Sequence, residues 1–292
     1  MSRYCPEYSL RQILRFFGVV HKWIEISLLV FKEGLYQEGS KYLIAIDETV
    51  IEKSGRHTHG KYRFYSSVYQ QVVFGIAFMA LSLIDVEKRK SYSIAQEQVI
   101  VSETDKNKAK ARKSKKRSER ENSKVKRGRG RPKGSKNKDK VETDTPAYRT
   151  FKILLEKVFS VFGRIIPQLT IKYAVLDSAY AAATFVQTLQ QYGLAIISKL
   201  SADAVLYLPA KPSPTKKRGR PAKYGQKIKL ADIDNLYLVQ TTQKENYTEY
   251  IYQVRGYQKA SLKRYLLNVV VIKCVYPNGK IQTAILFSTD LS

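Results

Sequence analysis

The chain has 292 residues, of which 43% are hydrophobic, and carries a net charge of +27 from 52 Lys and Arg against 25 Asp and Glu. This length and composition allow one large domain with insertions or two smaller domains. The two cysteines, Cys5 and Cys274, lie far apart and exclude a disulfide framework or a cysteine zinc cluster. The longest apolar run, residues 72–84, is too short to span a bilayer.

Most of the positive charge lies in two short tracts. Residues 105–140 hold 18 Lys and Arg against 4 Asp and Glu, and residues 211–229 hold 8 Lys and Arg with no acid. Such tracts attract polyanions through a field that salt weakens. Neither tract has the interleaved Leu, Phe or Trp of a membrane-surface helix, which favours nucleic acid over membrane as the partner. The start of the sequence does not have the pattern of a secretory signal, so we expect a cytoplasmic protein. Its basic tracts lead us to expect that it associates with the nucleoid.

The first part of the chain is predicted to contain a helix followed by strands. Apolar residues recur at helical spacing over 9–33, Ser9 is placed to cap this helix, and a break is expected near Gly18. Trp23 is expected to anchor the segment in the core. Three segments rich in Val, Ile and Phe are predicted as strands: 42–53, 72–86 and 91–101.

Two basic segments are predicted to be disordered loops. Residues 103–145 have almost no large apolar residues and no hydrophobic period, so they cannot bury enough surface to order themselves. Residues 209–232 combine basic residues with several prolines and are expected to form a linker.

The segment between these loops is predicted to alternate helices and strands. A helix is expected over 146–163, where apolar residues trace one face and Thr145 can cap the start. A strand at 171–177, a helix at 178–193 and a strand at 194–200 then follow in short order. This sequence of elements predicts a parallel βαβ unit.

From residue 236 onward the chain is predicted to be purely β, and "PNGK" at 277–280 is a strong hairpin signal. The predicted organisation has six parts. They are an N-terminal helical segment (1–40), the first half of the main α/β domain (41–102), a basic insertion (103–145), the second half with the βαβ unit (146–208), a basic linker (209–232) and a β-rich insertion with the last strand (233–292).

Two aspartates follow apolar runs in the predicted buried strands. Asp47 ends the run that begins at Tyr42, and Asp177 ends "IKYAVLD". If the two strands are neighbours, their carboxylates converge at one edge of the sheet and repel unless a cation lies between them. Oxygen ligands of this kind suit Mg²⁺ or Mn²⁺. The alternative is that each Asp is a turn residue or helix cap. Glu48 is expected to point away from the site.

Three blocks of sequence carry a family resemblance: "IAIDETVIEKSGRHTHG", "YAVLDSAY…GLAIISKL…DAVLYLP" and "ILFSTDLS". Together and in this order they resemble the DDE transposases of bacterial insertion sequences, in the branch with a β-rich insertion. The resemblance implies an RNase H-like α/β fold, with a mixed sheet flanked by helices. It also implies Mg²⁺-dependent cleavage and transfer of DNA strands, with Asp47 and Asp177 as catalytic metal ligands. Related enzymes act as dimers on paired DNA ends, so a homodimer is expected.

The resemblance also implies a third ligand, a Glu within a Tyr-xx-Arg-xxx-Glu pattern soon after "STDL". Tyr252 and Arg255 match the first part of this pattern, but Lys259 stands where the acid is expected. The sequence is therefore predicted to be truncated before the catalytic Glu, with impaired turnover. Asp290, at the end of the last predicted strand, is expected to lie beside the site.

Each basic tract contains Arg-Gly-Arg-Pro, at 129–132 and at 218–221. Pro and Gly keep this motif extended, so its arginines can follow an A·T-rich minor groove, as in an AT-hook. The alternatives are phosphate binding without base preference, and RNA as the partner. The residues predicted to contact DNA are Arg127, Arg129, Arg131, Lys133, Arg218, Arg220 and Lys223.

A second function fits the same tracts. A non-catalytic DNA-binding protein or transposition regulator would bind through its two Arg-Gly-Arg-Pro motifs without cutting. Its binding would survive removal of divalent ions and weaken steeply with salt.

Overall fold

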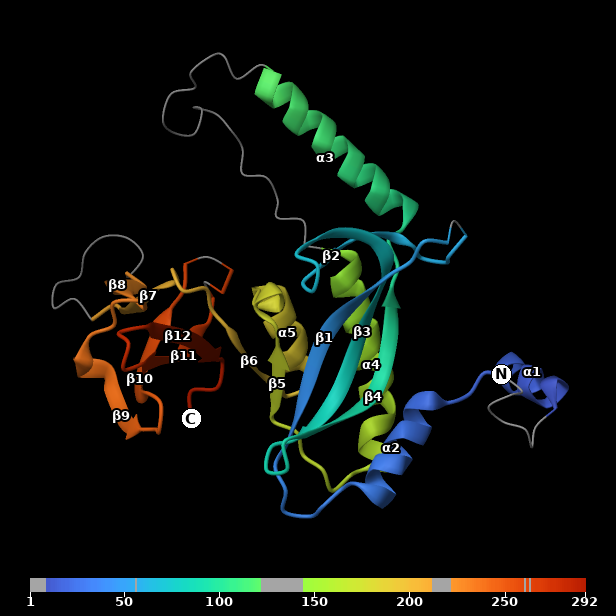
Figure 1. The fold of residues 1–292 in the computed structure, drawn as a ribbon, viewed down its shortest axis with the longest axis horizontal. Helices are drawn as coiled ribbons and strands as arrows, with labels where there is room; N and C mark the ends of the chain where they lie inside the picture. The colour runs from blue at the N-terminus through green and yellow to red at the C-terminus, as the bar shows by residue number, and fades with distance from the viewer. Residues whose placement is uncertain (1–8, 56, 122–143, 212–221, 260, 263) are drawn as a thin grey trace.

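One mixed β-sheet forms the centre of the structure. The computed structural model describes residues 9–55, 57–121, 144–211, 222–259, 261–262 and 264–292. The strands within these residues are β1 (Tyr42–Glu52), β2 (Tyr62–Ser66), β3 (Gln71–Asp85), β4 (Lys90–Val99), β5 (Tyr173–Leu176), β6 (Ala195–Lys199), β7 (Val205–Pro209), β8 (Tyr224–Lys229), β9 (Leu238–Gln243), β10 (Thr248–Tyr257), β11 (Leu266–Val275) and β12 (Ile281–Ser288). Their order is β2-β3-β1-β5-β6-β12-β11-β10-β7-β8, with β4 beside β3 and β9 beside β10 (Figure 1).

Three helices cover one face of the part of this sheet that runs from β4 to β6. The described helices are α1 (Leu10–Gly18), α2 (Trp23–Gly34), α3 (Glu103–Glu121), α4 (Pro146–Ile165) and α5 (Ala183–Gln191), with short turns at η2 (Ser178–Tyr180) and η3 (Asn235–Tyr237). Helices α2 and α4 pack on each other and on β4, and α5 packs on β6. Phe151 of α4 meets Phe185 of α5 with ring centroids 4.9 Å apart. The predicted α/β, RNase H-like class is therefore confirmed.

The two faces of the sheet differ in burial. Ile44 and Ile46 of β1 point toward the helices and are buried, whereas Ala45 is half-buried and Asp47 is exposed. We call the side away from α2, α4 and α5 the open face, defined by the strand positions in register with Ala45. The described positions on this face are half-buried or exposed. From β4 to β6 the helices that bury the core lie behind them.

The second half of the chain largely follows its predicted elements. Strands β5 and β6 pair in parallel with α5 between them, as the βαβ prediction requires. The hairpin of β11 and β12 closes through the Tyr276 N–H, which donates to the Lys280 carbonyl at 3.0 Å, with Gly279 at φ +78°. The disordered linker predicted for 209–232 is wrong over β8, because this strand pairs with β7 and buries Ile228.

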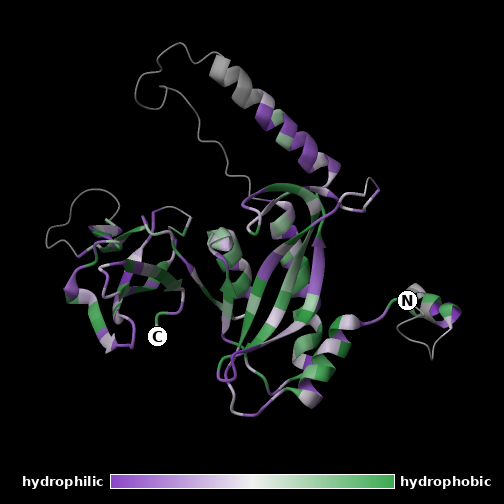
Figure 2. Cartoon of the chain, in the orientation of Figure 1, coloured by the Kyte–Doolittle hydropathy of each residue, from purple (hydrophilic) through white to green (hydrophobic). Residues whose placement is uncertain are grey.

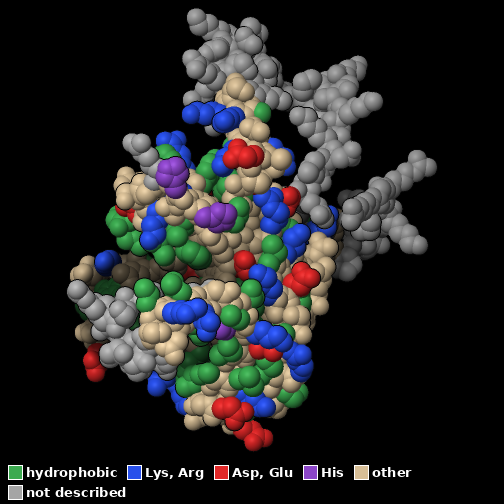
Figure 3. All heavy atoms as spheres, turned by 90° about the vertical axis from the view of Figure 1, so that its right-hand side faces the viewer, with side chains coloured by type: hydrophobic (Ala, Val, Ile, Leu, Met, Phe, Trp, Pro, Cys, Tyr) green, Lys and Arg blue, Asp and Glu red, His purple; other side chains and the backbone are tan. Residues whose placement is uncertain are grey.

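The N-terminal helices follow the predicted boundaries but not the predicted packing. Ser9 caps α1, and that helix ends at Gly18 as expected. Trp23 does not anchor the core: it is 54% exposed and lies against the rings of Phe16 and His21. Figure 3, which faces the side where α1 and α2 lie in Figure 1, shows apolar side chains exposed among Lys and Arg.

Helix α3 contradicts the predicted disorder of 103–145 over its own length. It consists mainly of Lys, Arg, Glu and Ala, which propagate a helix well without an apolar face. Its described part is mostly hydrophilic in Figure 2. Ser102 nucleates the first turn, because its hydroxyl accepts from the Asp105 N–H at 3.3 Å while the Asp105 carboxylate accepts from the Ser102 N–H at 3.1 Å.

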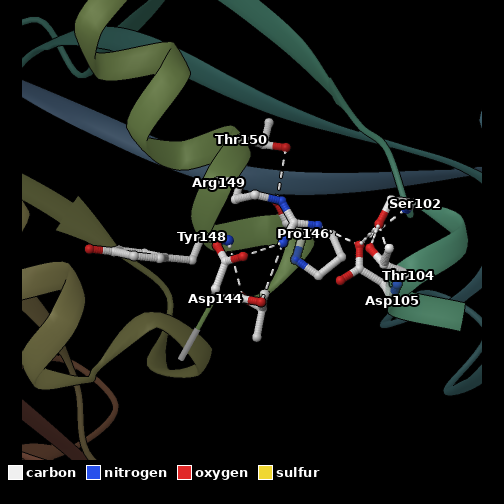
Figure 4. Close-up of polar contacts among 9 residues, drawn as sticks. Ser102, Thr104, Asp105, Asp144, Pro146, Tyr148, Arg149 and Thr150 are labelled. Carbon is white, nitrogen blue, oxygen red and sulfur yellow. Dashed lines mark hydrogen bonds and ion pairs between the residues drawn. The ribbon is translucent and has the colours of Figure 1, made fainter. Parts of the chain in front are cut away.

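An ion-pair network fastens this first turn to α4 (Figure 4). The Arg149 guanidinium of α4 pairs with Asp105 and, at 2.7 Å, with Asp144. The Ser102 hydroxyl donates to Asp105 at 2.6 Å. This hydrogen bond, helped by Arg149 and opposed by burial, holds the pKa of Asp105 below its usual range. The network lets a helix with no apolar face hold a defined position at its base.

We predict that Arg149→Gln loosens α3 at its base. Losing a pair of this kind costs about 1 kcal/mol, so amide protection in the first turn of α3 should fall about fivefold. Because the folded-state pKa of Asp105 is lowered, the ionised carboxylate stabilises the base of α3. This stabilisation is complete above about pH 4 and disappears as the pH falls through the folded pKa. Hydrogen exchange followed by mass spectrometry measures both effects.

Arg164→Gln is the matched control, because Arg164 also lies on α4 but pairs with Glu25 of α2. Protection of α3 should be unchanged in this variant. Equal loss of protection in both variants would refute the proposed anchor.

Candidate functional site

The pairing of β1 with β5 brings the two predicted aspartates side by side. These strands are parallel, with Ile44 opposite Ala174 and Ile46 opposite Leu176. The same register places Asp47 and Asp177 one residue beyond the last pair, on strands about 4.8 Å apart. Both side chains are exposed at this position of the open face.

Asp47 ends the apolar run but not its strand, in agreement with the strand predicted at 42–53. Strand β1 continues to Glu52 because β3 remains paired with it, from Asp47 opposite Ala80 to Glu52 opposite Gly75. Only the pairing with β5 stops. Asp47 therefore lies in a long paired strand whose neighbour on one side has ended, which exposes its carboxylate beside Asp177.

The local contacts of Asp177 bear on the alternative that it is a helix cap. Its backbone carbonyl accepts from the Tyr180 N–H at 3.0 Å, closing the η2 turn. Its side chain makes no capping hydrogen bond with the described residues, and its carboxylate accepts from the neighbouring Ser178 hydroxyl at 3.3 Å. The carboxylate of Asp47 accepts from the Glu48 N–H at 2.9 Å. The structure does not require the Asp177 side chain as a cap.

A partly buried hydrogen bond ties the two aspartate-bearing segments together. The Tyr180 hydroxyl, three residues after Asp177, donates to the carboxylate of Glu48, next to Asp47, at 2.7 Å. Burial, then the charge of Glu48, raises the pKa of Tyr180, and the charges of Asp47 and Asp177 act in the same direction. Tyr180 therefore stays protonated as a donor. Sequence reasoning missed this contact and set Glu48 aside.

The two aspartates fit a divalent cation. They offer oxygen ligands that repel each other when unpaired, and they lie at an exposed edge where water or phosphate can complete the coordination. The part of the chain that the structure describes contains no cluster of three or more His, Cys, Asp or Glu side chains suited to a metal ion. Asp47 and Asp177 are two oxygen ligands that could hold such an ion together.

Asp290 does not lie beside these residues, contrary to expectation. It pairs with Lys172 at 2.9 Å and accepts from the Tyr173 hydroxyl at 2.6 Å, at the amino end of β5. The hydrogen bond from Lys172, then that from Tyr173, lowers the pKa of Asp290. The cause is topology: β12 runs antiparallel to β6, so its carboxyl end meets the end of β5 opposite Asp177.

Most of the predicted DNA-contacting residues, Arg127, Arg129, Arg131, Lys133, Arg218 and Arg220, lie outside the described residues. Lys223 is described and precedes β8. Its ammonium lies 4.4 Å from the ring centroid of Tyr257 and donates to the Arg264 carbonyl at 3.4 Å. None of the described helices is long and apolar enough to cross a membrane.

Comparison with known proteins identifies the family of the chain. No curated protein matches the chain. A family model described as "DDE superfamily endonuclease" matches residues 7–261, which include both aspartates and every element from α1 to β10. Since this match covers most of the sequence, the chain belongs to the DDE superfamily of endonucleases.

Proposed function

We propose that this endonuclease is a transposase that cleaves and transfers DNA strands, with Asp47 and Asp177 binding Mg²⁺ or Mn²⁺. The observation that carries the proposal is the parallel register of β1 and β5, which puts both carboxylates at one exposed point. The DNA expected from the sequence resemblance is the end of an insertion sequence. A homodimer acting on paired ends and a preference for A·T-rich DNA belong to the same proposal.

The residues of the chain have three tasks in this reaction. Asp47 and Asp177 hold the ion, which when bound can activate a hydroxyl and stabilise the leaving oxygen. The Tyr180–Glu48 hydrogen bond keeps the two aspartate-bearing segments at a fixed separation. The open face leaves the carboxylates accessible to a phosphodiester.

We predict that Asp47→Asn and Asp177→Asn each abolish Mg²⁺-dependent nicking of DNA. Changes to groups that merely support a metal ligand cost about 10- to 100-fold, so loss of a ligand should exceed about a hundredfold. The assay measures nicking of supercoiled and element-end DNA, with and without EDTA.

Asp203→Asn serves as the matched control, because Asp203 is an exposed acid before β7. Nicking should be unchanged in this variant. Nicking that persists in both site variants would refute the assignment. DNA binding without any metal-dependent cleavage in the unmodified chain would favour the non-catalytic DNA-binding function instead.

Tyr180→Phe should weaken metal binding without touching either aspartate. It removes the hydroxyl that links the η2 turn to Glu48, so the two carboxylates are less well placed. Loss of a group that supports a metal ligand lowers metal affinity about tenfold or more, so the Kd for Mn²⁺ should rise about tenfold. Mn²⁺ titration followed by electron paramagnetic resonance measures this Kd independently of activity.

Tyr148→Phe is the control for this change. It also removes a tyrosine hydroxyl from the helical layer, one that contacts the Thr188 hydroxyl at 2.9 Å. Mn²⁺ affinity should be unaffected. If Tyr180→Phe binds Mn²⁺ as the unmodified chain does, the link does not position the site.

A further inference from the structure

The open face continues without a break from the aspartates to the far edge of the sheet. Cross-strand partners point to the same face, so the face can be followed from strand to strand. From β5 to β8 the partners in register are Val175 with Ile197, Ile197 with Ser288, Ser288 with Asn268, Asn268 with Arg255, Tyr257 with Tyr207, and Tyr207 with Lys227. Asp177 and Lys227 therefore lie on the same face of the twisted sheet.

A cluster of tyrosines and lysines, here called the Tyr–Lys cluster, ends this surface at β7, β8 and β10. Its members are Tyr207, Lys223, Tyr224, Tyr257 and Lys259. The Tyr224 ring lies 5.8 Å from each of the other two rings. The Lys259 ammonium lies 3.6 Å from the centroid of Tyr207, and that of Lys223 lies 4.4 Å from Tyr257. These ring contacts hold both ammonium groups in place.

The charge of the surface is positive between β6 and β8. Its charged strand positions are Lys199, Lys227, Lys229 and Arg255, with Glu249 at the distant end of β10. The Tyr–Lys cluster adds two more cations. Gln253 and Asn268, joined by a 2.9 Å hydrogen bond, supply polar groups between them. A polyanion complements this face, and the two aspartates mark where such a polymer would be cut.

We propose that the open face from Asp177 to the Tyr–Lys cluster is the track along which duplex DNA lies. The position of the cut rests on the proposed function, but binding to the track does not. Five strand spacings, about 24 Å, separate β5 from β7 across the sheet. The register places Tyr207 level with Tyr173, four residues or about 13 Å along the strand from Asp177, so the separation is about 27 Å. At about 3.4 Å for each base pair, the cluster contacts phosphates about eight base pairs from the reacting one. The tyrosine rings orient the lysines before DNA arrives.

The test is fluorescence anisotropy of the full chain with a DNA duplex of about 30 base pairs in EDTA, over a range of salt concentrations. The double variant Lys223→Ala/Lys259→Ala should bind more weakly. Its plot of log affinity against log salt should be shallower by about two units, because each lysine that contacts a phosphate contributes about one.

Lys152→Ala/Lys280→Ala is the matched control. Lys152 lies on α4, where it also contacts a tyrosine ring, and Lys280 lies in the hairpin of β11 and β12. The salt slope should be unchanged in this variant. Equal slopes for the cluster variant and the unmodified chain would overturn the proposal, as would tighter binding of an RNA duplex.

Single substitutions of Tyr207 test whether its ring contact with Lys259 supports DNA binding, as distinct from an effect on folding. Tyr207→Phe keeps the ring beneath Lys259 and should bind DNA normally, whereas Tyr207→Leu should bind more weakly while circular dichroism stays unchanged. Identical binding by both variants would contradict the role of the ring. These binding assays contain EDTA, so their outcome does not depend on metal-dependent cleavage. Asp47→Asn should therefore retain DNA binding even if nicking is lost, which separates failure of the DNA track from failure of the proposed function.

Discussion

The structure depends on the parallel hydrogen bonding between β1 and β5. Three residue pairs, from Ile44 with Ala174 to Ile46 with Leu176, set a register that carries Asp47 and Asp177 to the same point. A shift of one residue would turn one carboxylate toward the helices, where burying a charge is costly. The buried side chains of Ile44, Ile46, Ala174 and Leu176 prevent this shift, so packing of the core also determines the geometry of the site.

The helices lie on one side of the sheet, which both buries the core and leaves the two aspartates accessible from the other side. Helices α2, α4 and α5 bury the core face from β4 to β6, and the positions of the opposite face are half-buried or exposed from the aspartates to the Tyr–Lys cluster. The Tyr180–Glu48 hydrogen bond reaches from the helical side to the segments that carry the aspartates. Rigid support from one side and approach of DNA from the other are therefore compatible in the same sheet.

Local sequence patterns predicted the elements well, but contacts between distant residues could not be predicted. The apolar runs before Asp47 and Asp177 indicate strands, and the turn residues of "PNGK" indicate a hairpin. The partner of Tyr180, by contrast, is 132 residues away and leaves no local pattern. Helix α3 was missed for the same reason: it lacks an apolar face, and its anchor, Arg149, lies 44 residues beyond Asp105. The position of Asp290 depended on the antiparallel direction of β12, which strand prediction alone does not give.

The most direct test is anomalous X-ray diffraction from crystals of the chain grown with Mn²⁺. The account predicts a manganese peak within coordination distance of carboxylate oxygens from both Asp47 and Asp177, about 2.2 Å from each. A fully occupied manganese elsewhere on the chain, with these two side chains turned apart, would contradict it.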